Sequence, residues 1–161
     1  MQIKPLINQY KINLSTSFLQ LITLLVGIVT IIILIWEPQV EGVNQTATNF
    51  EIYLQDPFLA LVYLGSIPFF VSIYQAYRLL DYVKQGRVLS TKSLDVLRII
   101  KRCFQIIIGT IILLEMIILI SPSDDHTGGV MIGIMISIVS LIIISLAIIL
   151  SSIIQHITSQ N

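Results

Sequence analysis

Four long stretches without charged residues constrain this sequence more than any other feature. The 25 residues between Lys11 and Glu37 and the 21 residues between Asp56 and Arg78 carry no charge. Glu115 is the only charge from residue 103 to residue 123, and no Asp, Glu, Lys or Arg follows residue 126. About 20 apolar residues, at 1.5 Å each in a helix, cross a hydrocarbon core of about 30 Å. The sequence therefore predicts four membrane-spanning helices, over residues 17–36, 57–79, 103–121 and 129–154.

Composition excludes an ordinary soluble domain. Hydrophobic residues make up 55% of the 161 residues and charged residues 11%, against about 25% charged residues in soluble domains. The apolar stretches lack the alternation of a lipid-facing barrel, and a helix satisfies its own backbone groups in lipid. We therefore expect an all-α fold in which residues 1–161 form a single integral membrane bundle.

The nine Lys and Arg residues predict the orientation. Lys4 and Lys11 precede the first span, and the other seven lie at or between the ends of the second and third spans. The loops that follow the first and third spans contain acidic residues and no Lys or Arg. The positive-inside rule therefore predicts that the N-terminus, the central loop and the C-terminus are cytoplasmic. The first apolar run exceeds the 7–15 residues or so of a signal peptide and no cleavage motif follows, so we expect this span to be retained.

The central loop predicts an amphipathic cytoplasmic helix over residues 90–102. Gly86 is a candidate C-cap of the second span, and Ser90 is a candidate N-cap of the amphipathic helix. Two roles are open for the basic face around this loop. It either fixes the topology of the chain in the membrane or binds a ligand, which is anionic lipid or a soluble partner. Its residues are Lys84, Arg87, Lys92, Arg98, Lys101 and Arg102.

The segment from Tyr63 to Gln155 resembles a bacterial family of small membrane proteins catalogued as domain of unknown function 2975. The residues that carry the resemblance are Ile67-Pro68-Phe69-Phe70, Tyr74-Gln75-Ala76, Leu79-Leu80-Asp81-Tyr82-Val83 with Lys84 and Gly86, Leu89-Ser90, and Asp124-Asp125 with Gly128-Gly129. The resemblance implies a multi-pass protein of the bacterial plasma membrane, often encoded beside small helix-turn-helix regulators. It implies no activity and no functional residue.

Glu115 is the one ionisable residue deep within a predicted span. A central acidic residue costs about 2.5–3.5 kcal/mol on insertion scales. We expect Glu115 to face the bundle and to hydrogen-bond Tyr63 or Ser66, which lie at a similar depth in the second span, or water from outside. It is either a proton or cation site of a carrier or a carboxyl group that fixes helix packing.

Two further patterns predict contacts between helices. Gln20, Gln75 and Gln105 lie at comparable depth in three spans, where amides bond across helices. Small residues form one stripe along the last span, and Gly129 and Gly133 make a GxxxG pattern that allows close packing within the chain or between two copies in a homodimer. The stripe consists of Gly129, Gly133, Ser137, Ser140, Ala147 and Ser151.

Three function classes stay open at this point. The favoured one is a regulatory or partner-binding membrane component without catalytic activity, whose partner is a small helix-turn-helix regulator or another membrane protein. The alternative is a small oligomeric transporter or channel that uses Glu115. A membrane enzyme is the least favoured, because no nucleophile–base pair, HExxH or phosphate-binding loop is present. We expect no cofactor, no metal and no direct binding to nucleic acid, and we interpret Asp124, Asp125 and His126 as a solvated turn.

Overall fold

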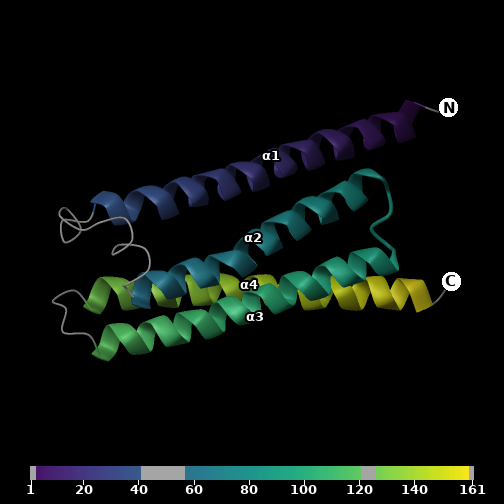
Figure 1. Cartoon of the computed structure of the whole chain (residues 1–161). Coiled ribbons are helices and arrows are strands. Elements are labelled where there is room, and N and C mark those ends of the chain that lie inside the picture. The colour runs from purple at the N-terminus through teal and green to yellow at the C-terminus, as the bar shows by residue number, and fades with distance from the viewer. Residues whose placement is uncertain (1–2, 41–56, 121–125, 160–161) are drawn as a thin grey trace.

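The computed structural model describes residues 3–40, 57–120 and 126–159, with side chains described for 12–36, 58–120 and 128–159. The described residues form four α-helices (Figure 1): α1 (Ile3–Val40), α2 (Pro57–Lys84), α3 (Thr91–Ile120) and α4 (His126–Ser159). Each contains a segment that is long and apolar enough to cross a membrane. The predicted all-α fold with four membrane-spanning helices is therefore confirmed.

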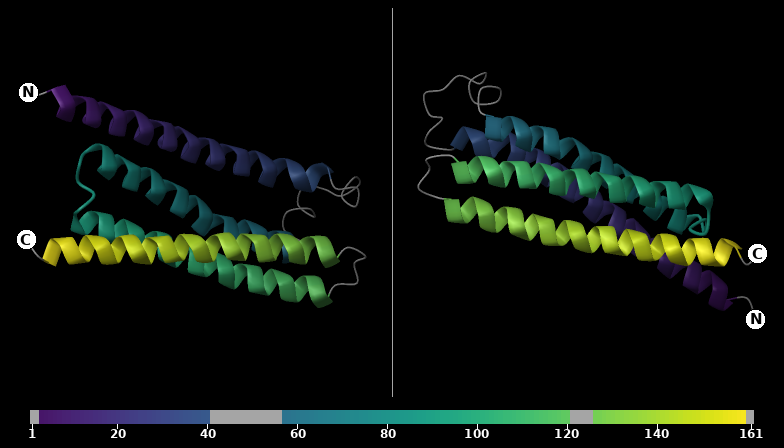
Figure 2. Two further views of the ribbon diagram at one scale, coloured as in Figure 1. Left: turned by 180° about the vertical axis from the view of Figure 1, so that it is seen from behind. Right: turned by 90° about the horizontal axis from the view of Figure 1, so that it is seen from below.

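The helices pack in the order of the sequence. α1 packs on α2, α2 on α3 and α3 on α4. Both chain ends and the turn between α2 and α3 lie at the same end of the molecule in all views (Figures 1 and 2). We call this the basic end, because it carries Arg87, Lys92 and Arg98. The arrangement matches four antiparallel crossings of one slab.

α3 joins two predicted segments into one helix. The amphipathic helix expected at residues 90–102 and the span expected at 103–121 form a continuous helix of 30 residues, Thr91–Ile120. At 1.5 Å per residue its length is about 45 Å, which exceeds a hydrocarbon core of about 30 Å. The first turns of α3 therefore extend beyond the apolar slab at the basic end.

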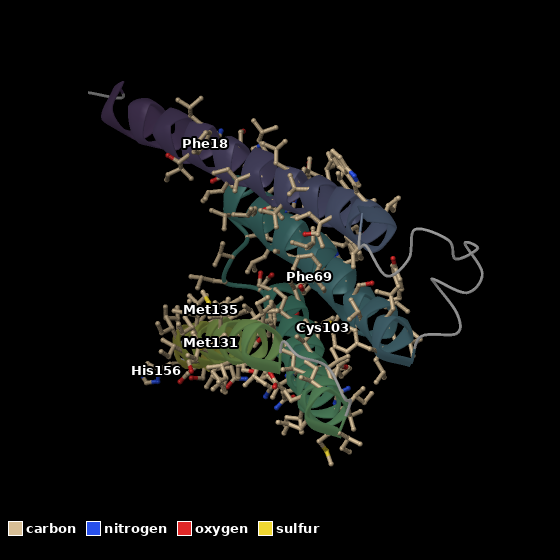
Figure 3. The ribbon with its side chains drawn as sticks, turned by 90° about the vertical axis from the view of Figure 1, so that its left-hand side faces the viewer. Phe18, Phe69, Cys103, Met131, Met135 and His156 are labelled. Atoms are coloured by element: carbon tan, nitrogen blue, oxygen red, sulfur yellow. The ribbon has the colours of Figure 1, made fainter. Side chains whose placement is uncertain are left out.

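The interior combines apolar side chains, such as Val96 and Ile100, with a few polar side chains, whereas large apolar side chains cover most of the outer surface. The buried polar residues are Thr16, Gln20, Ser72, Gln75, Ser93 and Ser140. Large apolar side chains such as Phe18, Leu119 and Met135 are mostly exposed, on all four helices (Figure 3). Apolar surface left in water costs about 25 cal/mol per Å², so this outer surface is suited to lipid.

A compact cluster of apolar side chains holds α2, α3 and α4 together near the basic end. Leu94 and Leu97 of α3 pack with Ala147 and Ile154 of α4, and Leu79 and Val88 lie against them. This cluster fixes the first half of α3 between α2 and α4, and it therefore positions the basic residues of α3.

Candidate functional site

Glu115 lies in the seam between α3 and α4, directly against Gly133. A Cβ atom added at Gly133 would collide with a carboxyl oxygen of Glu115 and would lie 3.3 Å from Cγ2 of Ile111. The carboxyl group therefore occupies the volume that a side chain at position 133 would need.

The expected hydrogen bond from Glu115 to Tyr63 or Ser66 is not formed among the described side chains. The Tyr63 hydroxyl donates to the backbone carbonyl of Leu34 in α1, and the Ser66 hydroxyl donates to the Tyr63 carbonyl at 2.7 Å. α2 meets α3 at Gly65, where an added Cβ would lie 2.8 Å from Cγ2 of Thr110. Glu115 is five residues later, about 140° around the helix at 100° per residue, so it faces α4 and not α2.

The small residues of α4 face α3 of the same chain. A Cβ at Gly129 would lie 2.8 Å from Cδ1 of Ile118, in the same way that Gly133 meets Glu115. Ser140 and Ala147 are buried on the same stripe, and Ser137 is half-buried. Of the two roles that the GxxxG pattern left open, the structure shows packing within the chain at Gly129 and Gly133.

Two of the three glutamines of the predicted layer are buried, and no hydrogen bond joins any two of them among the described residues. Gln20 and Gln75 are 6% and 7% exposed, and the Lys84 ammonium donates to Oε1 of Gln20 at 2.9 Å. Gln75 accepts a bond from Arg78 in its own helix at 3.4 Å. Gln105 is exposed, and its place in the layer was wrong. It is two residues after the buried Cys103, which turns it about 200° away from the interior.

The turn between α2 and α3 (residues 85–90) has a fixed backbone. Gly86 adopts φ +67°, and the amides of Gly86 and Arg87 donate to the carbonyls of Val83 (3.1 Å) and Tyr82 (2.9 Å). This pair of bonds is a Schellman motif with glycine at its left-handed position. The C-cap predicted at Gly86 is therefore confirmed.

Ser90 caps the start of α3, as the sequence predicted. Its hydroxyl accepts a bond from the Ser93 amide at 3.3 Å, and the Ser93 hydroxyl donates to the Arg87 carbonyl at 3.3 Å. Ser93 is completely buried. Bonds on both sides of the turn thus hold Arg87 and the start of α3 in one geometry.

Cationic side chains surround this fixed turn. Arg87, Lys92, Arg98 and Arg102 are exposed, whereas Lys84 and Lys101 are half-buried. The ion pair of Arg98 with Asp95, at 2.9 Å, joins side chains that are 62% and 63% exposed. Such an exposed pair contributes little free energy, so Arg98 is readily available to another anion.

Arg78 is a further ordered cation, which the sequence analysis treated only as a topology signal. Its guanidinium donates to the Tyr82 hydroxyl at 3.0 Å and lies 5.8 Å and 5.9 Å from the ring centroids of Tyr74 and Tyr82. The four-residue spacing of Tyr74, Arg78 and Tyr82 places the three on one face of α2. The same spacing in the sequence could have predicted that Arg78 contacts both tyrosine rings.

An apolar groove of about 380 Å³ lies between α1 and α4, over α2 and α3. Val26, Phe69, Phe104 and Leu146 are among the residues that line it, one from each helix. Figure 3 shows Phe69 of α2 between α1 and α4. Glu115 does not line this groove, so the acid and the groove are separate features.

The family of the chain follows from its sequence match. Residues 41–159 match the family described as "Protein of unknown function (DUF2975)". The chain belongs to this family. The chain is also similar to the "Uncharacterized membrane protein YoaS" of Bacillus subtilis (strain 168), with 30% identity over 156 residues, which cover 92% of this chain and 96% of the relative. No solved structure matches.

The DUF2975 match contains the seam between α3 and α4, the fixed turn and all six residues of the basic face. The resemblance inferred over residues 63–155 is thereby confirmed and extended. The side chains of Asp124, Asp125 and His126, which we interpreted as a solvated turn, lie outside the described part of this DUF2975 chain.

Proposed function

We propose that this chain is a non-catalytic component of the bacterial plasma membrane that binds a partner protein at its cytoplasmic face. The basic end is the cytoplasmic end in this proposal, in accordance with the positive-inside rule. The partner is a small helix-turn-helix regulator or another membrane protein with an acidic surface.

The observation that carries the proposal is the fixed cationic turn between α2 and α3. Arg87 and Lys92 are exposed beside a backbone held by the Gly86 and Ser90 caps. Leu89 lies between them in the sequence and is 53% exposed. A rigid site loses less conformational entropy on binding, and an exposed apolar residue among charges suits a protein contact.

The second observation is the anchor beneath this turn. Lys84 ends α2 and donates to the buried Gln20 of α1, so α1 braces the helix that leads into the turn. The transporter alternative has no comparable support, because Glu115 packs against Gly133 and does not line the groove.

Co-expression with a small helix-turn-helix regulator of the kind often encoded beside members of this family tests the proposal. We expect the tagged regulator to co-purify with the membrane fraction, and we expect the double change Arg87→Glu and Lys92→Glu to weaken the association about tenfold, equivalent to about 1.4 kcal/mol. The matched control reverses Arg98 and Arg102, two exposed cations of α3 more than two helical turns beyond Ser90, which makes the same change in net charge. A regulator that stays soluble with the unchanged chain, or equal losses in the two double variants, would refute the proposal.

A further inference from the structure

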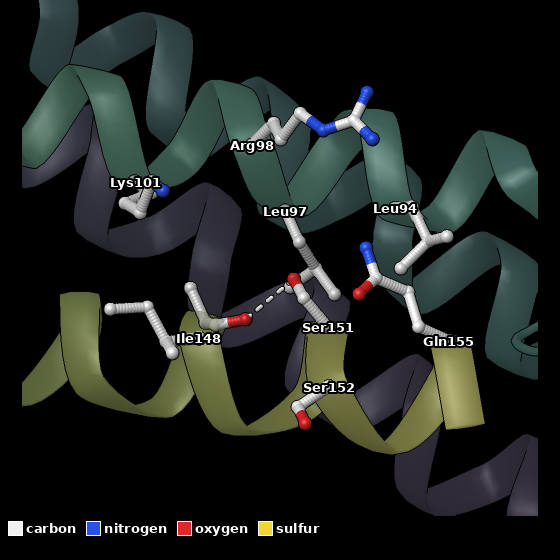
Figure 4. A pocket seen from close by; sticks show the side chains of 9 residues that line it. Leu94, Leu97, Arg98, Lys101, Ile148, Ser151, Ser152 and Gln155 are labelled. Atoms are coloured by element: carbon white, nitrogen blue, oxygen red, sulfur yellow. Dashed lines mark hydrogen bonds between the residues drawn. The ribbon is translucent and has the colours of Figure 1, made fainter.

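A second, smaller cavity lies at the basic end, between α3 and α4 and on the side of their seam that faces away from α2. Its volume is about 230 Å³ (Figure 4). The lining residues are Leu94, Leu97, Arg98 and Lys101 of α3 and Ala147, Ile148, Ser151, Ser152 and Gln155 of α4. It is thus half apolar and half polar, unlike the groove between α1 and α4.

The polar half of the cavity consists almost entirely of groups that can donate hydrogen bonds. Lys101 and Gln155 make no hydrogen bond or ion pair among the described residues. In Figure 4 the Gln155 side chain extends from α4 toward α3, next to the Ser151 hydroxyl. That hydroxyl donates to the Ala147 carbonyl at 2.7 Å and still has lone pairs. The Lys101 ammonium and the Gln155 amide line one small space, and the Arg98 guanidinium, which pairs with Asp95, lies on a residue that also lines it. Such donors suit an anionic oxygen ligand.

The depth of the cavity identifies the source of such an anion. The long uncharged part of α3 begins at Cys103 and ends at Ile120, interrupted only by Glu115. Lys101 and Arg98 precede it by two and five residues, which is about 3 Å and 7.5 Å along the helix. They therefore lie at the height of the lipid headgroups.

We propose that this cavity binds the phosphate group of an anionic phospholipid in the leaflet at the basic end. Lys101, Gln155 and Ser152 contact the phosphate oxygens, and Arg98 exchanges its exposed partner Asp95 for the same phosphate. Basic pockets between membrane helices on the cytoplasmic side commonly hold anionic headgroups. The proposal is independent of the partner protein proposed above, because it uses the seam and not the turn.

Native mass spectrometry of the full chain in detergent, titrated with phosphatidylglycerol, tests this site. We expect Lys101→Gln to weaken the apparent affinity about fivefold, and we expect Gln155→Leu to weaken it as well. Lys101→Arg keeps the charge and should retain most of the affinity, which also reports on folding. Lys92→Gln is the matched control, because Lys92 is an exposed cation of α3 that does not line the cavity.

Three outcomes would overturn the proposal. Equal losses for Lys101→Gln and Lys92→Gln would show general attraction of anionic lipid to the basic end. Equal affinity for phosphatidylglycerol and phosphatidylcholine would remove the preference for an anionic headgroup. Binding of inorganic phosphate with the same dependence on Lys101, without binding of phosphatidylglycerol, would identify a site for free phosphate and not for lipid.

Discussion

The carboxyl group of Glu115 and the missing side chain of Gly133 occupy one volume between α3 and α4. A close approach of this kind places a polar group in the contact between two helices, where it is partly shielded from lipid. The Tyr63 hydroxyl is satisfied by a hydrogen bond, which it donates to the backbone carbonyl of Leu34 in α1. At the scale of residues, Glu115 and Tyr63 thus each link one specific pair of helices, α3 with α4 and α2 with α1.

The contact between Glu115 and Gly133 predicts a coupling between the two positions. Gly133→Ala should lower the free energy of unfolding in mixed micelles by about 1–2 kcal/mol, because the new methyl group displaces the carboxyl group. Adding Glu115→Ala should recover most of that loss. Gly109→Ala is the control, because nothing lies within 4 Å of its Cβ position. Additive effects of Gly133→Ala and Glu115→Ala would contradict the contact.

The Tyr63 hydroxyl predicts a smaller and separate effect. Tyr63→Phe removes the bond to the Leu34 carbonyl and should lower the free energy of unfolding by about 0.6–1.7 kcal/mol, the range of hydrogen bonds between membrane helices. The same micelle assay measures it. Tyr77→Phe should have no effect, since the Tyr77 hydroxyl makes no hydrogen bond among the described residues. A Tyr63→Phe protein as stable as the unchanged chain would argue against this link between α1 and α2.

At the scale of elements, the hairpin of α2 and α3 is the most strongly specified part of the chain. Gly86 caps the end of α2 and Ser90 caps the start of α3, and Arg87 between them is hydrogen-bonded through both its amide and its carbonyl group. These local signals could be predicted from sequence, because caps depend on neighbouring residues only. Arg87 and Lys92, on which the proposed function depends, lie in and beside this turn. Mutations should therefore test whether the turn is rigid.

Substitution of Gly86 isolates the backbone strain of this turn. Gly86→Ala should destabilise the protein by about 1 kcal/mol through the positive φ alone, because no atom lies within 4 Å of the new methyl group. Gly86→Asn should cost less, since asparagine tolerates this conformation better. Thermal unfolding in detergent compares both with Gly109→Ala, a helical position with equal free space. If Gly86→Ala and Gly109→Ala have the same stability, the cap does not hold the turn as described.

At the scale of the whole molecule, the charges predicted most of the fold and little of the rotation of its helices. Gaps between charges located all four spans, and the extra length of α3 agrees with the amphipathic segment. Depth along a helix can be counted from sequence, but direction around it cannot when every face is apolar. For this reason Glu115 was assigned to α2 instead of α4, and the exposed Gln105 was placed in an interior layer. The acceptor of Tyr63 is a backbone carbonyl, which no side-chain pattern reveals.

The central claim is that the chain crosses the membrane four times, with both termini and the fixed turn on the cytoplasmic side. Labelling of single cysteines in intact cells tests it most directly, with Cys103→Ser as the background and one cysteine introduced at Arg87 or at Asp124. We predict that a membrane-impermeant maleimide labels position 124 in intact cells and labels position 87 only after permeabilisation. Labelling of position 87 in intact cells would contradict the account.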